Sequence, residues 1–586
     1  MTLPAAVVAL LIAAHAPAAD IAREHVETVG ASTHEYAVTM GGSMDGPSTR
    51  DPVGYAAWDQ VFEPNAFVRL ENVGETPVVN PRLRVNGRGP WHTVEEIVAE
   101  ALSELPPDAS DSERARAIWE LHRHHRFHAT TGDDECLDPV KVLNIYGYTL
   151  CGDDAQVVAD LWRAAGLRTR RGRPQGHCTT EVFYDGGWHL LDGDENIICL
   201  LRDNETIAQE ADVVRDHDLM KRTHTYGILA GESRQTDEFS ASLCVYEGED
   251  RSGDWQSHLG HGMRFTLRPG ESLEWRWDHR GKAHGLWEGK TLLTGWGETA
   301  WARHCNGYWR YEPKLIRRPF LDGLVGRENL ATFTSRSPLL HPAEARQPAS
   351  FVVEMNTPYV IVGGRIALRG HRGSAEDRLS VSLSFDGDDW VPVGEVGETG
   401  AFDETLDLDP HFPPEGPARY RYLLRVVMEA AHAAADAGLD ALRMENDVQM
   451  APLSLPALTL GANRVTYSDE SPGPRRVRIT HSWVERSESR PPGPPSAAVY
   501  PADGGESEGT DFAFEWRPAL DPDGDAIADY QFQLSSRPDM RWVLSPNFDR
   551  LIARTPDRGA ARYTLPQAGL LNPNQEYHWR VRARDE

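Results

Sequence analysis

The chain has 586 residues, and its 60 lysines and arginines stand against 89 aspartates and glutamates, for a formal net charge of −29. One hydrophobic core does not extend over this length, so we expect about three to five domains. The acidity argues against nucleic acid or an anionic membrane surface as a main partner, because either would repel the protein.

The N-terminus predicts a secretory signal peptide over residues 1–18. A short apolar run from Val7 to Ala14 precedes Ala16-Pro17-Ala18, whose small residues fit a cleavage site. No later run of about 18 apolar residues follows in the sequence, so we expect no transmembrane helix. The protein is therefore predicted to be secreted, periplasmic or held at the cell surface.

The segment 19–92 is expected to be rich in strands, and Phe67 to Val73 is its clearest extended run. Two helices are predicted next. The first covers residues 94–105, and the second begins with Ser110 and Glu113 in a capping-box relation.

Four histidines surround the end of the second helix: His122, His124, His125 and His128. Together with Cys136 or Asp133 they raise the question of a metal site. Without a second ordered group of ligands, we interpret them as a solvated helix end and loop. We expect no metal and no cofactor.

Cys151 is the most informative residue of the chain. It lies where a loop ends and a predicted helix begins. Apolar residues follow at helical spacing, namely Ala155, Val158, Ala159 and Trp162, and Gly166 stands where the C′ residue of that helix belongs. A cysteine at a helix N-terminus faces unpaired backbone N–H groups and the positive end of the dipole, and both favour the thiolate.

Two further side chains follow in the order of a cysteine triad. His177 opens a strand-like run, and Asp192 closes the next one. A nucleophile, a base and an orienting carboxylate are the parts that such a site needs, so we predict Cys151, His177 and Asp192 as catalytic residues. His189 remains a rival base, and Cys178 a rival nucleophile that lacks a helix dipole.

Three motifs resemble the transglutaminase-like superfamily: Leu150-Cys151-Gly152-Asp153, His177-Cys178-Thr179-Thr180-Glu181-Val182 and Trp188-His189-Leu190-Leu191-Asp192. Trp162 to Leu167 is similar to the family's helix exit. The resemblance implies an α+β, papain-like unit over residues 93–228 with a triad of Cys151, His177 and Asp192, and its His-x-x-x-Glu-Val spacing favours His177 over His189. Thr179 and Gly193 depart from the family's usual aromatic and proline.

Two neighbouring features complete the predicted site. The backbone N–H of Cys151 is one expected oxyanion donor, and Tyr148 is a candidate for the second. The basic cluster from Arg168 to Arg173 is interpreted as a solvated strand edge in preference to a contact for an acidic substrate.

Beyond residue 228 the helical signals nearly vanish. Residues 264–277 predict two strands around a turn at Pro269-Gly270, and Val381 to Trp390 predicts a strand with an Asp-Gly turn. We expect a β-rich domain over 229–347 and a β-sandwich over 348–489, followed by a stiff, proline-rich linker over 490–495.

Residues 496–586 resemble a fibronectin type III module, on the strength of Phe514-Glu515-Trp516, Leu571-Asn572-Pro573 and the alternating run from Tyr577 to Ala583. Tyr577 lies where such folds place a corner tyrosine. The sequence stops at Glu586 without a final strand, so we expect a truncated module. Asp521, Asp523 and Asp525 are interpreted as an acidic turn in preference to a calcium site.

The expected protein is multidomain, with an α+β papain-like or transglutaminase-like core followed by β-sandwich domains. We predict an exported, cysteine-dependent acyl-transfer enzyme that acts on extracellular or cell-wall-linked peptide or protein amides by hydrolysis or amine transfer. The alternative is an inactive extracellular binding protein whose β-sandwiches hold polysaccharide or protein on exposed tryptophans, with Trp275, Trp277, Trp301, Trp309 and Trp390 as candidates.

Overall fold

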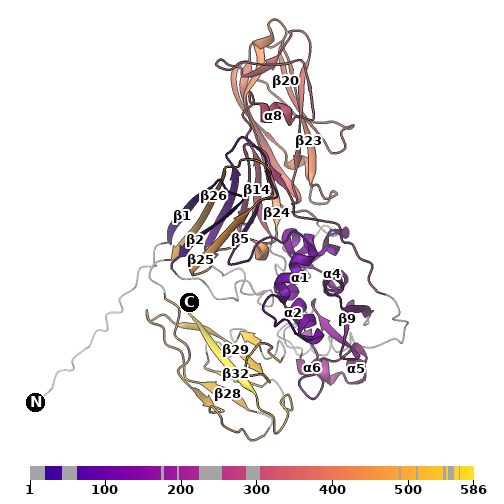
Figure 1. The fold of residues 1–586 in the computed structure, drawn as a ribbon, viewed down its shortest axis with the longest axis vertical. Helices are drawn as coiled ribbons and strands as arrows, with labels where there is room; N and C mark the ends of the chain where they lie inside the picture. Colours follow the sequence, from indigo (N-terminus) through magenta and orange to yellow (C-terminus); the bar gives the residue numbers. More distant parts are fainter. Residues whose placement is uncertain are drawn as a thin grey trace, which may run out of the picture.

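The computed structural model describes residues 20–42, 63–172, 177–194, 197–223, 254–285, 304–486, 490–509, 512–544, 549–551, 560–565 and 568–585. This part of the chain is mostly β, and it forms several sheets (Figure 1). The predicted signal peptide lies outside it, as do Arg173, Trp301 and Glu586. Within the described ranges, no helix is both long and apolar enough to cross a membrane.

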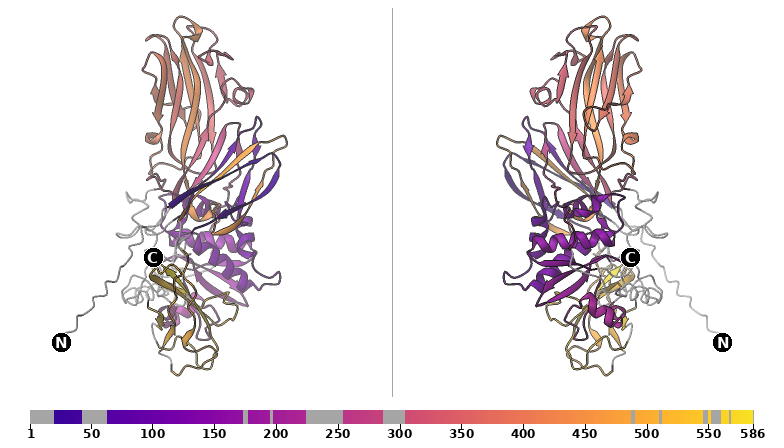
Figure 2. Two further views of the ribbon diagram at one scale, coloured as in Figure 1. Left: turned by 90° about the vertical axis from the view of Figure 1, so that its left-hand side faces the viewer. Right: turned by 90° about the vertical axis from the view of Figure 1, so that its right-hand side faces the viewer.

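Two β-sandwiches share one long antiparallel sheet. Its strands follow the order β1 (Asp20–Val29), β26 (Val477–Arg486), β3 (Asn65–Asn72), β13 (Glu271–Arg276), β14 (Cys305–Tyr311), β24 (Ala437–Met450), β17 (Leu340–Pro342) and β16 (Leu330–Thr332). Strand β24 belongs to both sandwiches, because Met444 to Met450 pair with β14 whereas Leu439 pairs with β17. The side views of Figure 2 show the two sandwiches one above the other.

Smaller sheets complete the two sandwiches (Figure 1). The lower one adds β2 (Thr33–Met40), β25 (Gly461–Ser468) and β5 (Arg82–Val85), and the short strands β4 (Val78–Val79) and β12 (Thr266–Leu267) pair beside them. The upper one adds β15 (Gly326–Glu328), β18 (Ala349–Asn356), β23 (Arg421–Glu429), β20 (Arg378–Ser384) and β21 (Val391–Glu395), while β19 (Ile361–Arg372) joins β24 to β22 (Gly400–Asp407).

The strands pair across the predicted domain boundaries. Strand β1, from the predicted segment 19–92, pairs along its whole length with β26, from the segment 348–489. Strand β13, from the segment 229–347, lies between β3 and β14. The side chains of β18 alternate between core and surface, with Ala349, Phe351, Val353 and Met355 buried, as the period of a strand requires. Alternation reveals that a segment is a strand, but it does not reveal the partner strand.

The helices gather in one unit between β5 and β12, as predicted for residues 94–227. They are α1 (Val94–Leu102), α2 (Asp111–His124), α3 (Pro139–Lys141), α4 (Cys151–Ala164), α5 (Glu210–Arg215) and α6 (Asp218–Thr223). They accompany an antiparallel sheet of β11 (Ile197–Ile198), β10 (Gly187–Asp192), β9 (Thr179–Tyr184) and β8 (Arg168–Gly172). The only other α-helix in the described ranges is the short α8 (Arg318–Asp322).

Local signals fix where these helices begin and end. Ser110 and Glu113 form the predicted capping box of α2, because each side chain accepts from the other residue's backbone N–H. Gly166 takes a φ of +82° just after α4, as a helix C′ residue does. The indole of the buried Trp162 donates to the carbonyl of Ala115 at 2.9 Å, which ties α4 to α2.

A C-terminal module packs two three-stranded sheets together. One has β27 (Ala498–Tyr500), β28 (Ala513–Trp516) and β31 (Arg562–Thr564), and the other has β30 (Asp549–Leu551), β29 (Ile527–Ser535) and β32 (His578–Asp585). The hydroxyl of Tyr577 accepts the N–H of Asn572 at 2.9 Å, a side-chain contact to the backbone a few residues upstream.

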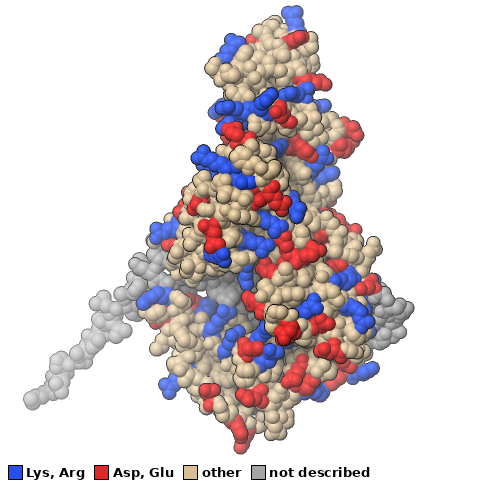
Figure 3. All heavy atoms as spheres, in the orientation of Figure 1, with Lys and Arg blue, Asp and Glu red and all other residues tan. Residues whose placement is uncertain are grey.

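The C-terminal module lies beside the helical unit (Figures 1 and 2). The guanidinium of Arg116 on α2 stacks 4.8 Å from the ring centre of Trp542, and the Asn204 amide donates to the Leu570 carbonyl at 3.0 Å. On the molecular face drawn in Figure 3, acidic and basic side chains are interspersed despite the net charge of −29.

Candidate functional site

Cys151 is the first residue of α4, as the sequence predicts. The N-cap residue Leu150 is extended, with φ −96° and ψ 171°, and its N–H donates to Oδ2 of Asp153 at 3.2 Å. The same carboxylate oxygen accepts the hydroxyl of Thr130 at 2.5 Å. The loop before the helix is therefore anchored by the first turn, and the half-buried, free thiol of Cys151 stands at the helix N-terminus.

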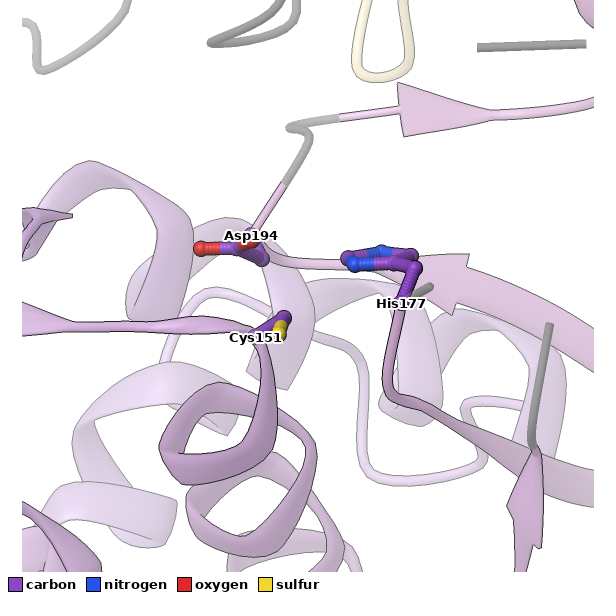
Figure 4. Close-up of side chains that lie close together, drawn as sticks. All are labelled: Cys151, His177 and Asp194. Carbon is purple, nitrogen blue, oxygen red and sulfur yellow. The ribbon is translucent and has the colours of Figure 1, made fainter. Parts of the chain in front are cut away.

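His177 and Asp192 form a pair beside that thiol. Nε2 of His177 lies 2.7 Å from Oδ2 of Asp192, at the end of β10. The other oxygen of Asp192 accepts the N–H of Asp194 at 3.0 Å, so both carboxylate oxygens are held in place. The sulfur of Cys151, a ring nitrogen of His177 and a carboxylate oxygen of Asp194 all lie within 4.8 Å of one another (Figure 4). Asp192 contacts His177, and His177 lies beside Cys151. The three residues predicted from the sequence, Cys151, His177 and Asp192, thus meet at one place.

Cys178 also belongs to this centre. Its thiol forms a hydrogen bond with the side chain of Cys151, and that contact, together with burial, raises the pKa of Cys151, while the hydrogen bond with His177 acts in the opposite direction. From the sequence, we expect the helix N-terminus to favour a thiolate. In the structure the contact with Cys178, burial and the Asp194 carboxylate all raise the pKa of the thiol, which is the direction opposite to that expected from the helix N-terminus.

Arg126, which the sequence analysis did not single out, connects the two loops of the site. Its side chain is 0% exposed and makes five hydrogen bonds. On one side it donates to the hydroxyl of Thr149 at 2.8 Å and to its carbonyl at 2.7 Å. On the other side it donates to the carbonyls of Gly193 and Asp194 at 3.1 and 3.0 Å and pairs with the Asp194 carboxylate.

This arrangement follows from a short strand pair. Strand β6 (Phe127–His128) runs parallel to β7 (Tyr148–Thr149), which leads into Cys151. Arg126 comes directly before β6, so its backbone lies beside the start of β7, and its long side chain reaches Thr149 at the end of β7 and the loop at Gly193 and Asp194. Nothing in the sequence around Arg126 marks it, since four of its five bonds go to backbone carbonyls or to a hydroxyl.

A second buried pair lies behind the site. Nε2 of His122 and Oδ1 of Asp154 are 2.6 Å apart, and both side chains are buried. A Cβ on Gly193 would lie 2.8 Å from Oδ2 of Asp154 and 3.1 Å from Cδ2 of His122. Position 193 therefore has room only for glycine, which gives a physical reason for the absence of a larger residue after Asp192.

The rival base, His189, is occupied elsewhere. Its ring stacks on Tyr184 with centroids 3.7 Å apart, and its nitrogens lie 2.6 Å from the Ile207 carbonyl and 3.2 Å from that of Tyr184. Both nitrogens therefore contact backbone carbonyls, and the geometry favours His177 as the partner of Cys151.

Tyr148 is fully buried, and its hydroxyl lies 3.5 Å from the carbonyl of His284 and 3.5 Å from the side-chain nitrogen of Gln449. The ring therefore packs where the helical unit meets the lower sandwich. A role of Tyr148 in an oxyanion hole stays a prediction, and the hydroxyl would have to leave these contacts to act as a donor. The N–H groups of the first turn of α4 remain the nearer candidates.

Of the histidines at the end of α2, the side chains of His122, His124 and His125 each have a different partner. Besides the pairing of His122, Nδ1 of His125 lies 2.7 Å from the Leu121 carbonyl, and His124 lies 3.8 Å from Glu120. In the C-terminal module, ligand atoms of Asp521, Asp523 and Asp525 approach within 4.8 Å. Arg490 pairs with Asp523 at 2.6 Å, however, and Asp521 accepts backbone N–H groups, as in an acidic turn.

The basic residues of β8 stack on aromatic rings. The guanidinium carbon of Arg168 lies 3.7 Å from the ring centre of Phe183, and that of Arg171 lies 4.1 Å from Trp255. Arg170 pairs with Glu181 at 2.6 Å. These contacts favour a structural role at the strand edge.

The tryptophans of the sandwiches are largely internal. Trp275 and Trp309 are buried, while Trp277 and Trp390 are half-buried, and Arg425 covers the ring of Trp390 at 4.2 Å. The buried rings of Trp275 and Trp309 and the covered ring of Trp390 therefore lack the open face that stacking on a sugar would need.

No known protein family and no curated protein matches the sequence. Among solved structures, the glycoside hydrolase domain of Endo-D from Streptococcus pneumoniae R6 aligns at 11% identity and a TM-score of 0.10, over 61% of this chain and 51% of that one. The T13 IBDV viral particle protein aligns at 8% identity and a TM-score of 0.12, over 80% and 78%. Similarities of this size carry no argument about fold or function.

Proposed function

We propose that the chain is a cysteine-dependent acyl-transfer enzyme of the transglutaminase-like type, with a papain-like unit over residues 93–228. The observation that carries the proposal is the meeting of three groups: a thiol at a helix N-terminus, a histidine, and a buried carboxylate 2.7 Å from that histidine. These are the nucleophile, base and orienting group of a cysteine triad.

In the proposed reaction, the sulfur of Cys151 attacks the carbonyl carbon of an amide while its proton moves to His177. Asp192 orients the imidazole and stabilises its charged form. The carbonyl oxygen becomes an oxyanion, and the N–H groups at the start of α4 stabilise it. The C–N bond then breaks, His177 gives its proton to the departing amine, and a thioester on Cys151 remains.

Water or an amine resolves the thioester. His177 takes a proton from the incoming nucleophile, the C–S bond breaks, and the thiol of Cys151 forms again. Because the surroundings of Cys151 raise the pKa of its thiol, we place the deprotonation in the attack itself, and a strongly depressed thiolate is not required.

The remaining parts of the proposal concern the setting of this reaction. We infer export from the sequence of residues 1–18, and substrates that are extracellular or cell-wall-linked peptides or proteins. The C-terminal module resembles a fibronectin type III domain in its corner tyrosine, and together with the two sandwiches it supplies surfaces beside the catalytic unit.

The test uses purified full-length protein and a set of glutamine-containing peptides, with and without a primary amine. Ammonia, peptide cleavage and amine incorporation are followed separately. Incorporation identifies a transferase, cleavage a protease, and ammonia alone an amidase. If no acyl transfer is seen and a thiol-reactive probe fails to label Cys151, the proposal is wrong and a binding protein becomes the better description.

A further inference from the structure

A cavity of about 170 Å³ lies where the upper sandwich meets the segment that follows β13. Its walls come from that segment, from the start of β19, from the residue after β20 and from the loop that leads into β23. The catalytic residues proposed above do not line it. Most of the lining is apolar, namely Ile361, Val362, Phe385, Phe412, Pro413 and Pro417.

The two phenylalanines give the cavity an aromatic wall. Phe385 and Phe412 meet edge to face, with ring centres 5.6 Å apart and planes at 87°. Rings in this arrangement offer both a face and an edge to a third ring, and both contacts are favourable between aromatic groups. An apolar cavity of about 150 Å³ is large enough to bind benzene. The cavity therefore has room for one aromatic ring with a short substituent.

Arg419 gives the lining a positive charge. Its guanidinium carbon lies 4.1 Å from the ring centre of Phe385, so the flat face of the guanidinium stacks on a wall of the cavity. In this arrangement the N–H groups at the edge of the guanidinium remain able to donate. Among the residues that the structure describes, none accepts a hydrogen bond from this guanidinium or forms an ion pair with it.

The other polar groups of the lining leave that charge uncompensated. Burial lowers the pKa of His284 and of His411, so both imidazoles are neutral at pH 7. The described lining residues include no aspartate or glutamate. Asp133 lies 3.5 Å from Nε2 of His284 but outside the lining, and Asp409 pairs with Lys282 at 2.5 Å. The lining therefore carries a charge of one, which favours a ligand with a single negative charge.

We propose that this cavity binds a small aromatic monocarboxylate. The ring of the ligand would pack against Phe385, Phe412 and Ile361, and its carboxylate would accept a pair of hydrogen bonds from the guanidinium of Arg419. An arginine that stacks on one side and donates along its edge is suited to a planar carboxylate. The proposed function assigns no role to this cavity or to Arg419.

The experiment measures binding of phenylacetate to the purified full-length protein by calorimetry. Phenylacetamide, which has nearly the same shape but no charge, is measured beside it. We expect saturable binding of phenylacetate with a Kd below about 1 mM, and binding of phenylacetamide that is weaker by about tenfold or more. Arg419→Met should lower the affinity for phenylacetate by about tenfold or more and bring it to the level of the amide.

Arg425→Met is the matched control. Arg425 also stacks on an aromatic ring of the upper sandwich, that of Trp390 at 4.2 Å, but it does not line the cavity. This variant should leave the affinity for phenylacetate within about twofold. Equal loss of affinity in Arg425→Met and Arg419→Met would contradict the assignment.

A second measurement needs no variant. Phenylacetate should slow hydrogen exchange of the unmodified protein in peptides that cover residues 282–285 and 409–419, because these segments form the walls of the cavity. Absence of saturable binding, equal affinity for the acid and the amide, or unchanged exchange in both segments overturns the inference. These measurements use no peptide substrate, so a protein without acyl-transfer activity that binds phenylacetate in this way would overturn only the proposed function. An active enzyme that does not bind phenylacetate would overturn only the inference about the cavity.

Discussion

Replacement of Arg126 by methionine is the most direct test of how the site is held together. The substitution keeps an unbranched side chain of similar length but removes all five hydrogen bonds. It leaves the Asp194 carboxylate, whose side chain is 2% exposed, without its cationic partner. Removing one member of a buried ion pair costs about 3–5 kcal/mol, because the remaining charge is neither solvated nor paired.

The loss of stability should be confined to the helical unit, which contains both Arg126 and Asp194. A multidomain chain does not unfold in one step, so we would measure hydrogen exchange of peptides from α4 and β10, where opening free energies are local. We expect Arg126→Met to lower the opening free energy of α4 by about 4 kcal/mol. The double variant Arg126→Met with Asp194→Asn should recover part of that loss, because the uncompensated charge is gone.

Arg202→Met is the matched control. Arg202 pairs with Asp216 at 2.7 Å, but its side chain is 59% exposed, and surface ion pairs contribute about 0–1 kcal/mol. If Arg126→Met costs no more than Arg202→Met, or if the double variant is no more stable than the single one, Arg126 does not connect the two loops as described.

Four further predictions concern the same unit. Cys151→Ala should abolish acyl transfer in a peptide assay. Asp192→Asn should lower kcat by about 10³-fold while leaving thiol labelling of Cys151 detectable, because only the imidazole is misoriented. Equal activity of Asp192→Asn and the parent protein would rule out the triad. Gly193→Ala should destabilise the unit by about 1–3 kcal/mol in the same hydrogen-exchange measurement, because its Cβ would lie 2.8 Å from Asp154 Oδ2. Burial raises the pKa of Asp153 to about 6 in the folded protein, compared with about 4 in the unfolded chain. The resulting contribution to the free energy of unfolding is fully present below about pH 4, where the carboxyl is neutral, and it is lost as the pH rises through about 6. Asp153→Asn should therefore become more stable relative to the parent protein between pH 4 and about pH 7, and a stability difference that does not change with pH would contradict this assignment.

The features that the sequence predicted well are local ones. The start of α4 at Cys151, the capping box of Ser110 and the C′ position of Gly166 each depend on residues within one helical turn. The pairing of His177 with Asp192 was predictable because His177 lies just before β9 and Asp192 ends β10, and these two strands form one antiparallel hairpin.

The features that the sequence did not predict are non-local. The position of β13 between β3 and β14 depends on side chains from three distant segments that bury one another. Arg126 acts mainly through backbone carbonyls, which leave no mark in the sequence. The raised pKa of Cys151 arises from its surroundings in three dimensions, where Cys178 and Asp194 meet the helix N-terminus.

The pairing of β1 with β26 has a consequence for how the protein is made. Asp20 pairs with Arg486 and Val29 with Val477, so β1 leaves the ribosome long before β26, the strand with which it pairs. Until then β1 has an unsatisfied row of backbone N–H and C=O groups, while the helical unit between them is complete much earlier. The helical unit is therefore able to fold during translation, whereas the long sheet of the lower sandwich closes only after β26 has emerged.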